Sequence, residues 1–166
     1  AMRRSGTDLR CALFVASTVQ EEIGLRGAKT AAYSIDPHVG IAVDVTHATD
    51  CPTIDRRQQG EINLGQGPVI FRGPNMNPKV VDRLVRESDA QKTPYQISAL
   101  GRAAPNDSNS LQVNRGGVAS GLVAIPNRYM HSAVETISLD DIDHAADLLA
   151  DFAKSISPED DFRPTI

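Results

Sequence analysis

The stretch HVGIAVDVTHA, residues 38 to 48, decides the fold that we expect for this chain. Its centre, Val39 to Val45, is almost continuously apolar and rich in β-branched residues, which is typical of a buried strand. Asp44 stands near the end of this apolar run. Because a buried strand needs hydrogen-bonding neighbours on its edges and helices over its faces, we expect both elsewhere in the chain.

Further strands and helices alternate on either side of this stretch. Short apolar runs predict four more strands, at residues 9–18, 68–73, 94–100 and 116–126. Apolar residues at helical spacing predict helices at residues 25–35 and 77–91, and a last helix that starts after Ser138. The alternation predicts an α/β sandwich with a largely parallel sheet.

The chain has the length of one ordinary domain, with 166 residues. We expect that domain to span residues 9–156. Residues 1–8 are interpreted as an unstructured lead-in, and residues 157–166, SPEDDFRPTI, as a frayed polar tail. No internal repeat and no second domain is indicated.

Composition excludes several classes of function. Hydrophobic residues make up 40% of the chain and charged residues 23%, so a buried core is expected. The formal net charge is −4 and no basic stripe is present, so nucleic acid is not the expected partner. No apolar run reaches the roughly 18 residues of a membrane helix, so no membrane partner is expected either. Cys11 and Cys51 form neither a disulfide framework nor a zinc motif, and with no signal peptide we expect a cytoplasmic setting.

Polar residues gather where expected strands end. The adjacent Glu21 and Glu22 follow the run 9–18, Asp44 closes the next strand, and His131 lies in the loop after 116–126. Ligands of open α/β sheets sit at the carboxyl ends of the strands, so these residues could converge in one cleft. Carboxylates and an imidazole together suit a divalent metal such as zinc, cobalt or manganese.

Two adjacent glutamates can divide the work at such a site. Neighbouring side chains of an extended segment point in different directions, so one carboxylate can bind a metal while the other faces a water on it. The metal lowers the pKa of that water to about 7, and the free carboxylate can then accept its proton. From the residues alone, the alternatives stay open: a solvated Glu-Glu turn, a structural Asp44, a structural His131, or a ligand role for His47. His38 and His144 are interpreted as surface residues.

Five segments in this order resemble the M42 family of dinuclear metallo-aminopeptidases, which includes deblocking and tetrahedral (TET) aminopeptidases and proteins once labelled endoglucanases. The segments are TVQEEIGLRGAKTAAY, IAVDVTHATD, LGQGPVI, TPYQISAL and NDSNSLQVNRGGVASGLVAIPNRYMHSAVE. The resemblance covers residues 9–156 and implies the C-terminal part of the family's catalytic domain. It implies a three-layer sandwich with a mixed, largely parallel sheet flanked by helices, of the phosphorylase/hydrolase type, but incomplete.

The resemblance also implies roles for individual residues. The first Glu of QEE, Glu21, corresponds to the general base and Glu22 to a metal ligand. Asp44 corresponds to a ligand of a second metal and His131 to a further ligand, with zinc or cobalt as the two divalent ions. The segment NDSN resembles a family loop that reads Thr-Asp-Ala-Asn, and Asp107 keeps its acid. The expected reaction is removal of N-terminal residues from peptides.

Parts of the family's site have no counterpart in this sequence. The resemblance implies an N-terminal His ligand, a bridging Asp and an insertion that builds the oligomer, and none of these matches residues 1–8. We therefore expect weak or absent metal binding and no activity of this chain alone, present as a fragment or short form. Exposed apolar surface would favour a homo-oligomer.

Two other functions were compatible with the sequence. A short paralogue without activity could act as a binding or assembly subunit. A glycoside hydrolase would need two carboxylates about 5 to 9.5 Å apart beside a sugar groove. The absence of Trp to stack on sugars, with aromatics at 4%, counts against that reading.

Overall fold

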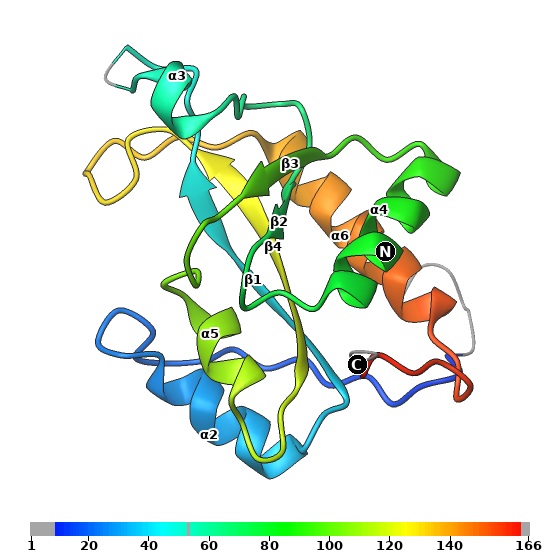
Figure 1. The fold of residues 1–166 in the computed structure, drawn as a ribbon. Helices are drawn as coiled ribbons and strands as arrows, with labels where there is room; N and C mark the ends of the chain where they lie inside the picture. The colour runs from blue at the N-terminus through cyan, green and yellow to red at the C-terminus, as the bar shows by residue number, and fades with distance from the viewer. Residues whose placement is uncertain (1–8, 53, 164–166) are drawn as a thin grey trace.

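Two nine-residue strands run parallel through the centre of the molecule (Figure 1). They are β1 (Val39–His47) and β4 (Ala119–Asn127), in a computed structural model that describes residues 9–52 and 54–163. The two strands pair over their whole length. β4 is buried along almost all of its length, because it lies inside the sheet and helices cover it.

Two short strands complete the sheet. β2 (Val69–Arg72) pairs antiparallel with β4, and β3 (Gln96–Ala99) pairs parallel with β2. The order is β1-β4-β2-β3, which leaves β1 at one edge. The sheet is mixed and largely parallel, as expected. The strand predictions at 38–48, 68–73, 94–100 and 116–126 are confirmed within a few residues.

Helices cover both faces of this sheet (Figure 1). One face carries α4 (Pro78–Gln91) and α6 (Leu139–Ser155), and the other carries α5 (Asp107–Gln112) with α2 (Arg26–Ile35) packed on it; the short α3 (Arg56–Gln59) lies in the loop after β1. A Cβ at Gly40 would meet Leu111 of α5, whereas one at Gly121 would meet Val80 of α4. Gly40 pairs with Ser120, so Gly121 faces the opposite side. The expected α/β sandwich is confirmed.

The core is aliphatic, as the scarcity of aromatic residues predicted. Fully buried side chains of β2, β4, α4 and α6 form it, among them Ile70, Val80, Leu84, Leu122 and Leu148. In the described part of the chain, no helix combines the length and the apolar character that crossing a membrane requires.

The expected first strand at residues 9–18 is wrong. This segment crosses the molecule without strand pairing, and among the described residues its backbone at 10–18 makes no hydrogen bond to other backbone groups. Leu13 is 50% exposed, Phe14 63% and Val15 91%. An apolar run becomes a buried strand only where a partner strand and a covering layer meet it, and the described residues offer neither here.

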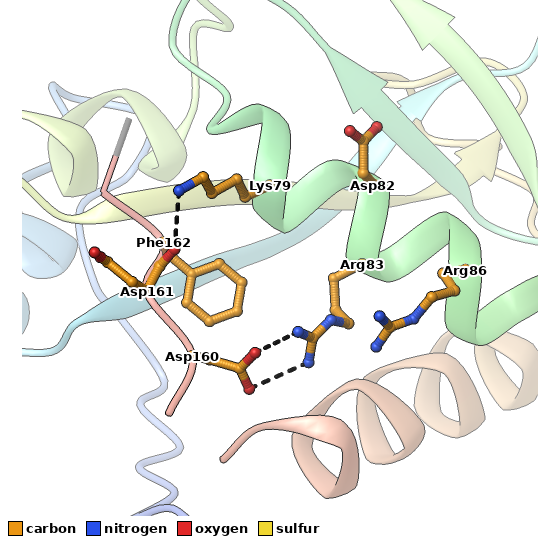
Figure 2. Close-up of a pocket in the computed structure, with 7 residues that line it drawn as sticks. All are labelled: Lys79, Asp82, Arg83, Arg86, Asp160, Asp161 and Phe162. Atoms are coloured by element: carbon orange, nitrogen blue, oxygen red, sulfur yellow. Dashed lines mark hydrogen bonds and ion pairs between the residues drawn. The ribbon is translucent and has the colours of Figure 1, made fainter. Parts of the chain in front are cut away.

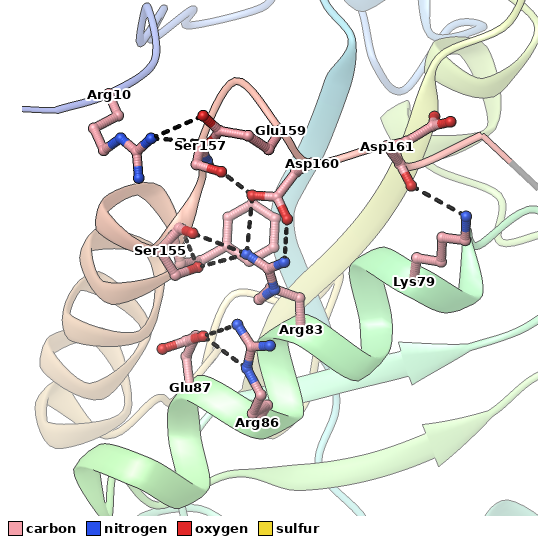
Figure 3. A network of polar contacts seen from close by, with 11 residues as sticks. Arg10, Lys79, Arg83, Arg86, Glu87, Ser155, Ser157, Glu159, Asp160 and Asp161 are labelled. Atoms are coloured by element: carbon pink, nitrogen blue, oxygen red, sulfur yellow. Dashed lines mark hydrogen bonds and ion pairs between the residues drawn. The ribbon is translucent and has the colours of Figure 1, made fainter.

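The segment after α6 is polar but not frayed. Residues 156–163 turn back along α4 (Figure 3), and Asp160 forms an ion pair with Arg83. The Phe162 ring is buried, 6.4 Å from the centroid of Phe152 and under the Arg83 guanidinium. Its carbonyl oxygen accepts a hydrogen bond from Asn77 Nδ2 at 2.7 Å. The acids and prolines of this segment predicted a frayed tail, but its one aromatic residue, Phe162, packs into the core. The predicted lead-in, residues 1–8, lies outside the described residues.

Candidate metal centre

A tight turn between residue 19 and α2 presents Glu21 and Glu22. Gln20 has a positive φ of 62°, which reverses the chain direction. The Glu21 carbonyl oxygen then accepts hydrogen bonds from the amides of Gly24 and Leu25, at 3.1 and 2.9 Å. The two carboxylates therefore project from a closed turn at the start of a helix, rather than from a strand end.

Asp44 projects from β1, the strand at the edge of the sheet. Its carboxylate is half-buried, and its Oδ1 accepts a hydrogen bond from the amide of Val45 at 2.8 Å. His47 follows three residues later, and side chains an odd number apart in a strand point to opposite faces. The alternative in which His47 joins Asp44 at one site is therefore not supported.

His131 lies in the loop that follows β4. This loop is closed by paired backbone hydrogen bonds between Arg128 and Thr136, at 2.9 and 3.1 Å. His131 has a positive φ of 65°, and its amide donates to the Glu135 carboxylate. The side chain is exposed.

The loops bring these residues to the same edge of the sheet. Nε2 of His131 lies 3.5 Å from Oε1 of Glu22. Asp44 and Asp107 lie close enough to Glu21 for their charges to affect its ionisation. Glu22 and His131, which come from separate loops, therefore meet in the fold.

The carboxylates crowd one another. Burial raises the pKa of Glu21 above its ordinary value, and the negative charges of Asp44, Glu22 and Asp107 raise it further, opposed by His131. Burial also raises the pKa of Asp44, against the lowering effect of the hydrogen bond from Val45. A cation bound among these carboxylates would relieve their mutual repulsion.

Asp107 belongs to this cluster and has a partner that the sequence did not indicate. Its Oδ2 accepts a hydrogen bond of 2.7 Å from the hydroxyl of Thr18, 89 residues away. Asp107 was singled out through the NDSN segment, but no local pattern marks Thr18. Only the placement of α5 beside the turn brings the two together.

The donor set suits a divalent metal but is incomplete. Carboxylate oxygens and an imidazole nitrogen are ligands that zinc and related ions accept, and Glu22 and His131 face each other closely enough to bind one ion. Within the described ranges, however, no three His, Cys, Asp or Glu side chains lie in an arrangement that could hold a metal ion.

A separate hollow of about 310 Å³ lies on the other side of the sheet, between α4 and the C-terminal segment (Figure 2). Lys79, Arg83 and Arg86 line it together with Asp82, Asp160, Asp161 and Phe162. Its basic side chains already form ion pairs or hydrogen bonds with acids and backbone carbonyls of the chain itself. We therefore interpret it as a packing contact between α4 and the C-terminal segment.

The sequence of this chain resembles those of known aminopeptidases. The family model of M42 glutamyl aminopeptidases matches residues 1–148. A lysyl aminopeptidase of Pyrococcus furiosus is 40% identical over 150 residues, which cover 89% of this chain and 42% of that protein. This chain thus spans less than half the length of that relative.

Solved structures share the fold. A TET aminopeptidase from a marine-sediment Thaumarchaeota archaeon superposes with a TM-score of 0.87 and 30% identity, over 95% of this chain and 44% of that one. A TET1 peptidase of Pyrococcus horikoshii, described as assembling into a tetrahedron or a large octahedral shell, gives 0.65 and 25%, over 84% and 40%. With most of its length matched by the family model, this chain belongs to the M42 family of aminopeptidases.

Proposed function

We propose that this chain carries the base and part of the ligand set of a metal-dependent aminopeptidase site. Glu21 is the general base, Glu22 and His131 are ligands of one divalent metal, and Asp44 is a ligand of a second. The observation that carries the proposal is the meeting of Glu22 and His131 at 3.5 Å, with Asp44 close enough to Glu21 for its charge to raise the pKa of Glu21.

The residues divide the reaction between them. When bound, the metal pair supplies the positive charge that polarises a peptide carbonyl and eases deprotonation of the attacking water. Glu21 accepts the proton of that water on its carboxylate and then delivers it to the nitrogen of the leaving amine. The raised pKa of Glu21 suits this exchange, because a base that later acts as an acid needs a pKa closer to neutrality.

This chain needs further ligands to run that reaction. Catalytic zinc sites use three protein ligands, and the closest pair here offers two. We therefore propose that hydrolysis requires the rest of the family's catalytic domain, on the same polypeptide or on another chain. The exposed apolar side chains of Leu13, Phe14 and Val15 and the unpaired edge of β1 are surfaces on which it could dock.

The experiment measures metal content and hydrolysis of leucyl-p-nitroanilide on one purified sample, with Co²⁺ or Zn²⁺ added. We expect weak metal uptake, lost on Glu22→Gln, and no turnover by this chain alone. Turnover that Glu21→Gln abolishes would mean that a neighbouring copy or this chain supplies the remaining ligands. No uptake of either metal at millimolar concentration would contradict the proposed site.

A second candidate is a subunit without catalysis that binds or assembles. The exposed apolar surface favours it, since such patches are common at protein interfaces. The TET1 peptidase can assemble into a tetrahedron or a large octahedral shell, and we propose self-association for this chain as well. Gel filtration over a range of concentrations tests it, with Val15→Lys as the variant expected to shift the chain to monomer.

A further inference from the structure

A hydrogen bond from α5 holds the segment that leads into the turn with Glu21 and Glu22. The hydroxyl of Thr18 donates a part-buried hydrogen bond of 2.7 Å to Oδ2 of Asp107. Thr18 stands three residues before Glu21, at the point where the extended segment enters the turn. Asp107 is the first residue of α5, which packs against both β1 and β4. The contact therefore ties a loop to the sheet.

A second contact fixes the next residue along. The amide of Gly27 donates to the carbonyl oxygen of Val19 at 2.9 Å. A Cβ at Gly27 would lie 2.4 Å from both the amide nitrogen and the carbonyl oxygen of Val19, so only glycine permits this approach. Thr18 is therefore held by α5 and Val19 by α2. These two contacts fix the direction in which the chain enters the turn before it reaches Glu21.

The carboxylate of Asp107 has an unusual balance of contacts. Its Oδ1 is buried and has no hydrogen-bond partner among the described residues, while Oδ2 holds Thr18. A buried carboxylate oxygen without a partner costs stability, and the neighbouring acids Glu21 and Asp44 add repulsion. Folding stability alone therefore does not account for an acid at this position.

We infer that Asp107, acting through Thr18, is the positioning residue that sets where Glu21 and Glu22 project. The inference rests on the proposed function for the roles of those two glutamates. The hydrogen bond between Thr18 and Asp107 does not depend on that proposed function. A charged acceptor makes the bond stronger than a neutral one would, so the turn is held more firmly.

Hydrogen exchange tests the contact directly in this chain. The amides of Gly24, Leu25 and Gly27 report on the turn, because they close its hydrogen bonds. Thr18→Val, which removes only the donor, is expected to speed their exchange about tenfold, since a bond to a charged group is worth at least about 1.4 kcal/mol. Thr18→Ser restores the hydroxyl and is expected to exchange like the unsubstituted chain.

Matched variants separate a positioning role from a general loss of stability. Thr30→Val removes a hydroxyl that donates only to backbone carbonyls of α2, and it is expected to leave the turn's exchange unchanged. Combining Thr18→Val with Asp107→Ala is expected to speed exchange no more than Thr18→Val does alone, because both remove the same bond. Exchange in Thr18→Val that matches Thr30→Val, or that rises equally throughout β4, overturns the inference.

Titration with Co²⁺ alone connects the contact to the glutamates. Thr18→Val is expected to weaken Co²⁺ binding about tenfold, and Thr18→Ser to restore it. A loosened turn with unchanged Co²⁺ affinity overturns the positioning role. If the unsubstituted chain takes up no Co²⁺, the proposed metal site fails. The amide exchange of the turn in Thr18→Val, and its return to the original rate in Thr18→Ser, then still decide whether the contact with Asp107 holds the turn.

Discussion

Oε1 of Glu22 and Nε2 of His131 lie 3.5 Å apart, although they come from loops far apart in the sequence. Both side chains are mostly exposed, at 77% and 67%. An exposed ion pair of this kind contributes little to stability, because solvent screens it. We propose that a shared metal ion, rather than a gain in folding stability, accounts for this arrangement.

Substitution of either residue is expected to remove the metal site. Glu22→Gln and His131→Ala should each weaken Co²⁺ binding at least tenfold, because each removes one of two close ligands. Isothermal titration calorimetry measures the affinity. His38→Ala is the matched control, since His38 is exposed and stands before β1. Unchanged affinity in His131→Ala would show that the ion binds among the other acids.

Glu21→Gln is expected to stabilise the chain at neutral pH. Burial and neighbouring acids raise the pKa of Glu21 above its ordinary 4.5, so its ionisation opposes folding. Below that ordinary value the folded and unfolded chains both hold the proton, and the two proteins should melt alike. As the pH rises through the raised pKa, the unsubstituted chain loses stability and the variant does not.

Thermal melts from about pH 4 to pH 8 measure this difference. The control is Glu61→Gln, an exposed glutamate near Arg56, which should give no pH-dependent gain. An equal advantage of Glu21→Gln at every pH would rule out repulsion as its cause. The same variant should keep its Co²⁺ affinity, because Glu21 is proposed as a base and not as a ligand.

Most strands of the sheet could be predicted, because a short apolar run by itself indicates each of them. The runs at 38–48 and 116–126 both form strands, because they pair with each other within this chain. The second is buried along almost all of its length, but the first is not the buried strand that its apolar residues predicted: it lies at the sheet edge, and Val43 is 56% exposed. The run at 9–18 is also apolar, and it lies exposed because burial depends on a neighbour that composition does not reveal. Apolar pattern therefore predicts what a segment can bury, not whether the described residues bury it.

The candidate site likewise has residues that motifs identify and a contact that only the fold reveals. Glu21, Glu22, Asp44 and His131 were identified through motifs, and the fold brings them to one edge of the sheet. Thr18 was not identified, because its contact depends on how α5 sits against a loop 89 residues earlier. Contacts at that sequence separation depend on tertiary packing and carry no local signal.

Phe162 is expected to anchor the C-terminal segment. Phe162→Ala should destabilise the chain by about 3 kcal/mol, because it leaves a cavity beside Phe152 and Arg83. Phe14→Ala is the matched control: its ring is 63% exposed, so a change within about 0.5 kcal/mol is expected. Urea unfolding measures both. Equal effects from the two substitutions would mean that the segment does not contribute to the folded core.

Asp141 joins the start of α6 to the loop before β2. Its side chain is fully buried, and its two oxygens accept hydrogen bonds of 2.8 Å each from the amides of Gly65 and Gly67. A Cβ at Gly67 would lie 2.2 Å from the carbonyl oxygen of Pro94, so the loop has no room to move away from this contact. The loop is held in one conformation by this carboxylate.

Asp141→Ala should therefore cost about 3 kcal/mol, since it leaves two amides without their acceptor in a buried loop. For a chain of this size that corresponds to a fall of roughly 10 °C in the melting temperature. Asp140→Ala is the control, because Asp140 is exposed in the same first turn of α6 and makes neither bond. Asp141→Asn keeps one acceptor oxygen and should fall between the two. If Asp140→Ala destabilises the chain as much as Asp141→Ala does, the charge at the start of the helix matters and the two bonds to the loop do not.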